Sequence, residues 1–345
     1  MNLKTAIVIL NYNGKKHLER FLPSVIACSE APHRQIIIAD NGSTDDSVSF
    51  LQQRYPDLRL VLLDKNYGFA GGYNQTLKQI DADCLMLLNS DVEVTDNWLD
   101  PLEEELDKHA DVAACQPKIM SLHRPSYFEH AGACGGYLDK LGYPFCRGRL
   151  FETLEEDLGQ YDNVCDVFWA TGAALLIRSA DFFAAGGFDD LFFAHMEEID
   201  LCWRLKSRGR RIVCVPQSVV YHLGGGSMNV KNPYKTYLNF RNNQCMLYKN
   251  LSQREFDKIK RFRLLLDYLA ALEMLLTGQF SHALQVPKAR RDFKKMKPSL
   301  LLKREHNLQQ ALTTSLSGVL SKSLLELYYL RGKRVFSEIE QWIGN

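Results

Sequence analysis

The chain lacks a long hydrophobic run, and this absence excludes one class of protein at the outset. No stretch of about 18 apolar residues occurs in the 345 residues, because Asp267 and Glu273 interrupt the best candidate. We therefore expect no membrane-spanning helix. The N-terminal segment MNLKTAIVILNYNG has an apolar core of only about six residues, which is too short for a secretory signal.

Paired cysteine motifs and the common nucleotide-binding glycine motifs are also missing. The nine cysteines are an odd number without a CxxC pair, and several stand in apolar surroundings, among them Cys84, Cys202 and Cys214. This usage favours reduced thiols in a cytosolic compartment over a disulfide framework or a zinc site. The first apolar run ends in NYNG and not in GxGxxG, which argues against a nucleotide-binding dehydrogenase.

Net charge is small but unevenly distributed. The whole chain carries +1, yet residues 251–345 hold 17 Lys/Arg and 9 Asp/Glu, a net charge of +8, and the remaining 25 basic and 32 acidic residues give −7. An acidic body with a basic C-terminal region points to an anionic partner for that region, such as a phospholipid surface. We expect no nucleic-acid partner.

Hydrophobic periodicity predicts an α/β fold. Short apolar runs at 5–10, 36–39, 59–63 and 84–88 alternate with amphipathic stretches at 15–29, 44–55 and 72–81. This order is typical of a mostly parallel sheet covered on both faces. Further strands are expected at 164–178 and 212–221, a helix at 195–208, and a wholly helical region from Asn239 onward. We assign a catalytic domain to 1–250 and a helical, basic region to 251–345.

Polar residues follow each of the first four predicted strands. Because ligands bind beyond the carboxyl ends of parallel strands, these clusters mark one binding rim. The clusters are Asn11-Tyr12-Asn13, Asp40-Asn41, Asp64-Lys65-Asn66 and Asn89-Ser90-Asp91.

Each motif has a structural alternative when it is taken alone. Asp91, just past a buried strand, suits Mg²⁺ or Mn²⁺, but it also suits a helix N-cap. Asp40, in DNGSTD, suits an ordinary turn. His222 is either a metal ligand or a loop histidine. The acids of MEEID at 196–200 fit either catalysis or a helix N-terminus.

The order of the motifs discriminates better than any one of them. NYN, DNGSTD, NYGFAGGYN, NSD, TGA, GGFDDLFF, EEIDLCWR and YHLGGGS together resemble inverting glycosyltransferases of family 2, which have the nucleotide-sugar-binding GT-A fold. The similarity is strongest to the rhamnosyltransferase-like branch of bacterial polysaccharide and O-antigen synthesis. It covers residues 5–250, whereas the last 95 residues are only loosely similar.

The resemblance implies a role for particular positions. Asp91 matches the last acid of the family's DxD motif and would hold Mg²⁺ or Mn²⁺ with His222, although Asn89 replaces the first acid. Glu198 stands at the Asp of the family's ED motif, the general base, and Glu197 at its Glu. Asp200 is the second candidate base, but it also lies four residues before Arg204, the spacing of a helical ion pair. The expected donor-binding residues are Asn11, Asn13, Asp40, Lys65, Asn66, Gly72, Asn74, Asn89, Thr171 and Gly172.

The implied activity is metal-dependent transfer from a UDP- or dTDP-sugar to a polyprenyl-linked or oligosaccharide acceptor. The alternative is a non-catalytic nucleotide-sugar-binding or scaffold protein on the same fold. In the C-terminal region, the basic runs at 258–263 and 288–297 bracket a dense apolar stretch. We expect this basic–apolar–basic order to lie on an anionic membrane at the inner face of the cell membrane. Packing of a helix at 262–286 on the catalytic domain or in a homodimer is the alternative.

Overall fold

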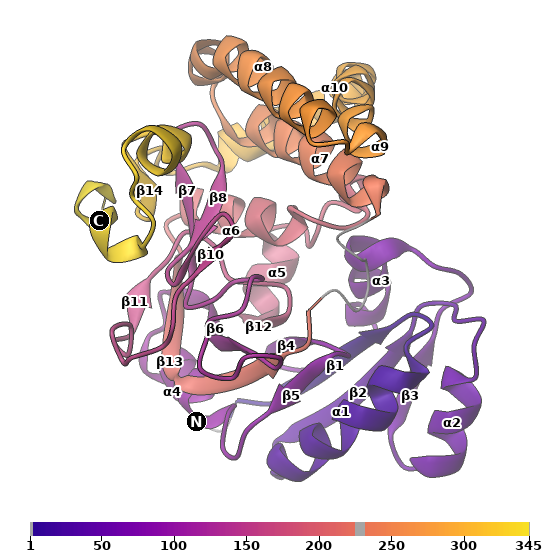
Figure 1. Ribbon diagram of the computed structural model, residues 1–345. Helices are drawn as coiled ribbons and strands as arrows, with labels where there is room; N and C mark the ends of the chain where they lie inside the picture. The colour runs from indigo at the N-terminus through magenta and orange to yellow at the C-terminus, as the bar shows by residue number, and fades with distance from the viewer. Residues whose placement is uncertain (1–2, 225–231, 345) are drawn as a thin grey trace.

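The first four strands of the protein form a parallel sheet, as the sequence predicts. The computed structural model describes residues 3–224 and 232–344 (Figure 1). The main sheet has the order β11-β13-β6-β12-β4-β1-β2-β3, with β5 paired to β13. Its parallel half consists of β1 (Thr5–Asn11), β2 (Arg34–Asp40), β3 (Arg59–Leu62) and β4 (Cys84–Asn89).

The other half of the main sheet is mixed. β12 runs antiparallel to β4 and β6, and β13 runs parallel to β6. The single strand expected over 164–178 is instead two short strands separated by residues 167–173, so that prediction was wrong. This half consists of β5 (Val92–Val94), β6 (Val112–Ser121), β11 (Cys165–Asp166), β12 (Ala174–Arg178) and β13 (Arg211–His222).

Alternation of side chains along the strands builds a core on each face of the sheet. In β1, Ile7 and Ile9 join one core while Ala6 and Val8 join the other. The first core is closed by α1 (Lys15–Cys28), α2 (Ser47–Arg54) and α4 (Asp100–Lys108). The second is closed by α3 (Gly68–Leu77), α5 (Ser179–Ala184) and α6 (Glu197–Ser207).

A smaller sheet stands over the main one and takes four of its five strands from the segment between β6 and β11. Its order is β10-β9-β8-β7-β14. Trp169, at the rim of the main sheet, donates from Nε1 to the carbonyl of Tyr137 in β7 at 3.0 Å, which fastens the two sheets together. The strands are β7 (Gly136–Asp139), β8 (Pro144–Cys146), β9 (Arg149–Leu150), β10 (Thr153–Leu154) and β14 (Val319–Leu320).

The C-terminal region is a layer of helices followed by a return to the small sheet. Figure 1 shows α7 (Pro233–Asn250), α8 (Gln253–Leu276), α9 (Phe280–Ala283) and α10 (Gln285–Gln310) at one end of the molecule. The helix expected over 262–286 ends at Leu276, where Gly278 takes a left-handed φ of 79° and the chain reverses. No helix in the described ranges combines the length and apolar character needed to cross a membrane.

Residues 311–344 do not continue the helical pattern, so the expectation of a wholly helical region was wrong there. β14 lies in this segment and adds to β7 as a parallel neighbour. The region therefore reaches back to the small sheet. The remaining short helical turns are η1 (Asp190–Phe192), η2 (Glu326–Leu330), η3 (Phe336–Glu338) and η4 (Glu340–Trp342).

Candidate active site

The ends of β1 and β2 are tied together by the side chains expected to meet the nucleotide. Asn11 donates from Nδ2 to Asp40 Oδ2 at 2.9 Å and to Ser43 Oγ at 3.1 Å. Asp40 also accepts from the amide of Ser43 at 2.8 Å, and Asn11 and Asp40 are both buried. Asn13 accepts from the amide of Thr44 at 2.7 Å. These residues thus shape the turn as well as the rim.

The loop after β3 closes onto the same rim. Asn41 donates to Asn66 Oδ1 at 3.1 Å and to the carbonyl of Gly68 at 2.9 Å. A Cβ placed on Gly72 would lie 2.9 Å from Asn41 Nδ2, so only glycine lets α3 approach this closely. Lys65 lies over the Tyr67 ring, 5.0 Å from its centroid. Lys65, Asn66 and Gly72 therefore gather where the sequence predicts.

Asn74, in contrast, is occupied in holding another segment. Its amide donates to the carbonyl of Phe188 at 2.8 Å, and its oxygen accepts from the amide of Phe188 at 3.0 Å. It thereby clamps the GGFDD loop against α3. Its assignment to donor binding stays a prediction, and these contacts support a structural role.

Asn89, Thr171 and Gly172 lie side by side at the junction of β4 and β12. The amide of Asn89 donates to the carbonyl of Ala173 at 2.9 Å. Thr171 is buried and accepts from the amide of Ala173 at 3.2 Å, and a Cβ on Gly172 would press on the Phe69 ring. The predicted donor rim is continuous from β1 to β12.

Asp91 and His222 are brought together by strand pairing. β5 begins one residue after Asp91 and runs antiparallel to the end of β13, with Val92 opposite His222. His222 Nε2 consequently lies 3.2 Å from Asp91 Oδ1, and both side chains are buried. The N-cap alternative for Asp91 does not apply, because a strand follows it. Residues 225–227 of the YHLGGGS motif lie outside the described residues.

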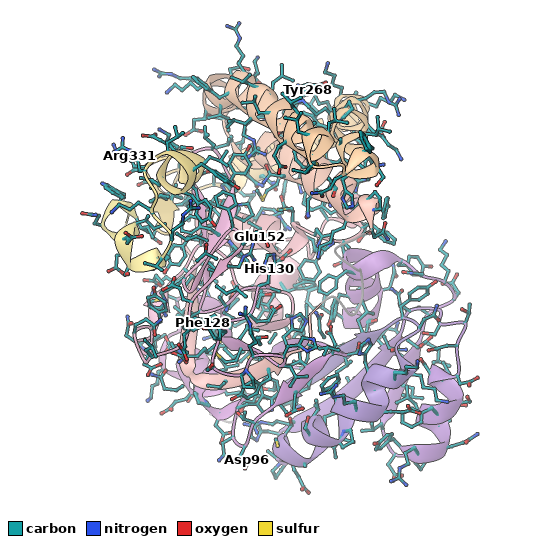
Figure 2. All side chains as sticks on the ribbon, in the orientation of Figure 1. Asp96, Phe128, His130, Glu152, Tyr268 and Arg331 are labelled. Carbon is teal, nitrogen blue, oxygen red and sulfur yellow. The ribbon has the colours of Figure 1, made fainter. Side chains whose placement is uncertain are left out.

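A third residue, Glu129, completes this corner, and sequence reasoning missed it. Glu129 Oε2 lies 3.1 Å from His222 Nδ1, on the side of the ring away from Asp91. The residue follows β6 on a loop whose neighbours Phe128 and His130 are labelled in Figure 2. Helical or strand periodicity gives no signal here, because Glu129 belongs to neither kind of element.

The three groups determine one another's ionisation. Burial lowers the pKa of His222, but Asp91 and Glu129 outweigh it and raise that pKa to about 10. Burial likewise acts to raise the pKa of both carboxyls, yet their hydrogen bonds and charge interactions with His222 hold each pKa below its usual range. The corner is therefore a compact, charged assembly of two acids and one imidazole.

Asp91 and His222 bring together an oxygen and a nitrogen donor of kinds that Mg²⁺ and Mn²⁺ accept, since Asp91 Oδ1 lies 3.2 Å from His222 Nε2. A cation bound there would replace the proton that the two atoms share, because a histidine ligand must be deprotonated. Within residues 3–224 and 232–344, three or more His, Cys, Asp or Glu side chains nowhere form a ready cage. Mg²⁺ and Mn²⁺ commonly take much of their coordination shell from water and substrate phosphates.

The acids of the EEID motif follow a turn with unusual backbone geometry. Phe193, His195 and Met196 all have left-handed φ values, of 66°, 69° and 74°. Such conformations cost non-glycine residues energy and persist only where neighbouring contacts enforce them. The carbonyl of Phe193 accepts from the amides of Phe69 at 2.7 Å and Ala70 at 3.2 Å, so the turn is pinned to the start of α3.

Asn242 of α7 holds the other side of the same turn. Its Nδ2 lies 2.9, 2.8 and 2.8 Å from the carbonyls of Phe192, Ala194 and His195. The side chain is fully buried, and its oxygen accepts from Arg241 Nε at 2.9 Å. Sequence reasoning did not single out Asn242. The only available signal was the polar run Arg241-Asn242-Asn243 inside a helix.

Glu197 and Glu198 begin α6 directly after this turn. One carboxylate oxygen of each is buried without a hydrogen-bond partner among the described residues. Burial raises the pKa of Glu198 to about 7, and burial together with the neighbouring charge of Glu198 raises the pKa of Glu197 well above its usual range. A carboxyl group with a pKa near neutrality is suited to general base catalysis.

Asp200, the second candidate base, is engaged in an ionic network. It contacts Arg204 Nε at 3.0 Å and Lys249 Nζ at 2.9 Å, and it is completely buried. Lys249 also contacts Asp189 at 2.6 Å, and Asp189 contacts Lys303 of α10 at 2.5 Å. These contacts support the structural role that the spacing from Arg204 suggested, and they fasten α6 to the helical layer.

Comparison with known proteins agrees with this fold. The family model described as glycosyl transferase family 2 matches residues 6–168. An N-acetylglucosaminyl-diphospho-decaprenol L-rhamnosyltransferase of Mycobacterium tuberculosis is 31% identical over 231 residues, covering 63% of this chain and 75% of the relative. The rhamnosyltransferase WbbL of Escherichia coli K12 is 24% identical over 268 residues, covering 73% and 97%.

Solved structures show the same fold at low sequence identity. Residues 1–349 of S. aureus TarS give a TM-score of 0.54 at 15% identity, covering 96% of this chain and 92% of that one. GalNAc-T7, solved with UDP, GalNAc and Mn²⁺, gives 0.57 at 17% identity, covering 85% and 54%. The protein has the predicted GT-A fold, and it belongs to glycosyl transferase family 2. It is therefore an enzyme of the glycosyltransferase class, and the dehydrogenase alternative is excluded.

Proposed function

We propose that the protein is a metal-dependent, inverting glycosyltransferase that moves a sugar from a UDP- or dTDP-sugar to a lipid-linked acceptor in cell-surface polysaccharide synthesis. The observation that carries the proposal is the combination of two features. An Asp91–His222 pair lies at the end of the parallel half of the sheet, and the partly buried Glu198 lies in the first turn of α6 with one carboxylate oxygen that has no hydrogen-bond partner among the described residues.

Asp91 and His222 would hold Mg²⁺ or Mn²⁺ when the donor is bound. The cation supplies charge neutralisation for the departing diphosphate. Asn89, which replaces the first acid of the family's motif, brings one negative charge fewer to this corner. Glu129 supports His222 from behind, because a carboxylate on the second ring nitrogen fixes the orientation of the ring.

Glu198 would act as the base toward the acceptor. In an inverting transfer the acceptor hydroxyl oxygen forms a bond to the anomeric carbon while the bond from that carbon to the diphosphate oxygen breaks. The hydroxyl proton passes to the Glu198 carboxylate, and the electron pair of the broken bond leaves with the nucleoside diphosphate. With a pKa of about 7, Glu198 is partly ionised at neutral pH and is basic enough to accept a proton.

The acceptor class and the transferred sugar are supported by the names of the relatives. The M. tuberculosis relative is named for a diphospho-decaprenol-linked acceptor, and the E. coli relative is a rhamnosyltransferase. Such a lipid-linked acceptor lies in a membrane, so we propose that this protein acts at the inner face of the cell membrane. An oligosaccharide acceptor is the second candidate, consistent with the O-antigen biosynthesis protein RfbC of Myxococcus xanthus, 29% identical over 223 residues.

A binding screen followed by a transfer assay tests the proposal. Thermal unfolding is measured with UDP-, dTDP- and GDP-sugars, each with and without Mn²⁺. The proposal expects a UDP- or dTDP-sugar to raise the midpoint only when Mn²⁺ is present, because the ligand stabilises only the native state. If only the GDP-sugar raises the unfolding midpoint, or if none of the sugar nucleotides raises it, the proposed donor is wrong.

A further inference from the structure

Helix α8 buries charged residues against the protein and exposes large apolar ones to the outside. The residues it buries are Phe256, Arg263, Asp267 and Ala271, two of which are charged. Large apolar residues point the other way: Phe262 is 64% exposed, Leu265 58% and Leu276 79%. A helix that only covered a protein core would show the opposite arrangement.

The buried charges of α8 are matched by specific partners, so the orientation is well determined. Arg263 donates to the carbonyl of Leu141 at 3.0 Å, and its guanidinium lies 3.8 Å from the centroid of the Tyr143 ring. Asp267 forms an ion pair with Arg290 of α10. Turning α8 over would leave these charges without partners, which is costly for ions already removed from water.

The exposed side of α8 has two parts along one stripe. Arg254, Lys258 and Arg261 come first, spaced by four and three residues, and none of them has an ion pair among the described residues. Exposed apolar residues then continue the same spacing along the helix and into the turn before α10. We call this surface the outer face of α8, and its apolar part comprises Phe262, Leu265, Leu269, Leu272, Leu276, Phe280 and Leu284.

The position of the outer face leaves it free to meet a large flat partner. Figure 1 shows α8 at the outer limit of the helical layer, with α7 on its inner side. Figure 2 labels Tyr268 on this helix, at the opposite end of the molecule from Asp96. Tyr268 is 47% exposed and adds an aromatic side chain with a polar end to the surface. Such side chains favour the boundary between water and lipid.

We propose that the outer face of α8 docks the protein on an anionic membrane, with its leucines among the acyl chains and its basic residues against the headgroups. Apolar burial and attraction to anionic lipid together are the two contributions that hold interfacial helices. A second copy of this chain fits less well, because it would bring a second region with a net charge of +8 to the same place. Membrane docking is a property separate from the proposed transfer reaction. Only the inference that docking brings the protein close to a lipid-linked acceptor rests on the proposed function.

Co-sedimentation with vesicles tests the docking without donor or acceptor. The full chain is mixed at low salt with vesicles of phosphatidylcholine alone or of phosphatidylcholine and phosphatidylglycerol in equal parts. We expect the protein to pellet with the mixed vesicles and to be released by high salt. Remaining in the supernatant with both vesicle types would overturn the proposal.

Two sets of variants separate the charged from the apolar part. The triple change Arg254→Glu, Lys258→Glu and Arg261→Glu is expected to weaken binding about a hundredfold or more, since each basic residue contributes about 1 kcal/mol. The matched control reverses three exposed charges outside the C-terminal helical layer, Lys4→Glu, Arg54→Glu and Lys78→Glu, and should bind like the wild type. If both triple variants lost the same amount of vesicle binding, the effect would come from the overall charge of the protein. Docking through the outer face of α8 would then be wrong.

The apolar part is tested by Leu265→Gln with Leu272→Gln, which add no charge, against Leu158→Gln, which is 80% exposed on the small-sheet side. All these positions are exposed, so thermal unfolding should stay near the wild-type midpoint in every variant. We expect only the α8 pair to abolish pelleting. If light scattering instead shows a dimer that the α8 pair dissociates, and vesicles are not bound, the outer face belongs to a second copy and the proposal is wrong.

Discussion

His222 Nε2 lies 3.2 Å from Asp91 Oδ1, although 131 positions separate the two residues in the sequence. The pairing of β5 with β13 creates this contact, and the contact sits where the carboxyl ends of the parallel strands meet. Around it the structure adds two supports that the motifs did not reveal, Glu129 behind His222 and Asn242 behind the turn that leads to Glu198.

Glu129→Gln is predicted to weaken Mn²⁺ binding about 10- to 100-fold, because it removes the carboxylate that orients His222. Titration of Mn²⁺ by electron paramagnetic resonance or calorimetry measures this without any activity assay. Glu152→Gln, an exposed change between β9 and β10, is the control and should bind Mn²⁺ like the wild type. Unchanged Mn²⁺ affinity in Glu129→Gln would remove the support role.

Glu198→Gln is predicted to lower kcat about 100-fold or more while donor affinity is kept, as expected for loss of a general base. In the wild type, kcat/KM should fall as pH drops below about 7, because protonated Glu198 cannot accept the acceptor proton. This decrease of kcat/KM at low pH, the acid limb of the profile, should be absent from the residual activity of the Glu198→Gln variant.

The comparison with Asp200→Asn distinguishes the two candidate bases. This change removes the carboxylate that pairs with Arg204 and is shared by Lys249, while Lys249 keeps its contact with Asp189. We therefore expect it to cost about 3 kcal/mol of unfolding free energy, the lower end of the range for breaking a buried ion pair. The folded fraction should retain the acid limb near pH 7. A folded but inactive Asp200→Asn together with an active Glu198→Gln would show that the base has been assigned wrongly.

Glu197→Gln is predicted to stabilise the protein increasingly as pH rises above about 4.3, the pKa of an ordinary Glu. Burial raises the pKa of Glu197, so the native state keeps a proton that the unfolded chain releases above about pH 4.3. Wild-type stability therefore falls as pH rises above this value, and a neutral Gln avoids that loss. The difference in unfolding midpoint should reach a few degrees, at roughly 2–4 °C per kcal/mol. A difference that does not depend on pH would contradict the burial of an ionisable Glu197.

Asn242→Ala is predicted to lower kcat by about 10²-fold, because small displacements of a catalytic group have effects of this size. Releasing the turn should expose Glu198 to water, lower its pKa toward the ordinary value and move the acid limb to lower pH. Asn243→Ala is a matched control, since this neighbouring buried side chain donates to the carbonyl of Gly142 at 2.8 Å. The control should lose stability and keep the pH profile. An identical profile in both variants would make Asn242 merely structural.

The parallel half of the sheet and its rim were predictable from sequence because both rest on local patterns. Apolar runs with alternating partners define β1 to β4, and the polar residues that end them lie on one rim by the geometry of parallel strands. Asp91, His222, Glu197 and Glu198 stood out as chemical groups at the ends of elements, but their roles came from the resemblance to glycosyltransferase family 2 and stay predictions.

The remainder depends on contacts that periodicity does not encode. Glu129 approaches His222 only because the loop after β6 folds back. Asn242 holds the turn before Glu198 from α7, a helix whose sequence gives no sign of that contact. The orientation of α8 could not be predicted from the sequence for a related reason. Its acid Asp267 is buried against Arg290, which turns the helix over and leaves the leucines outside. Tertiary ion pairs thus outweighed the local hydrophobic pattern.

Release of nucleoside diphosphate from a UDP- or dTDP-sugar in the presence of a lipid-linked acceptor tests the central claim most directly. The claim is that Asp91 and His222 hold the divalent cation that the transfer requires. We predict that the wild-type enzyme releases nucleoside diphosphate with Mn²⁺ and stops doing so with EDTA. The Asp91→Ala variant should release it at least about 100-fold more slowly, whether or not Mn²⁺ is added. Near wild-type release by Asp91→Ala in the presence of EDTA would contradict the account.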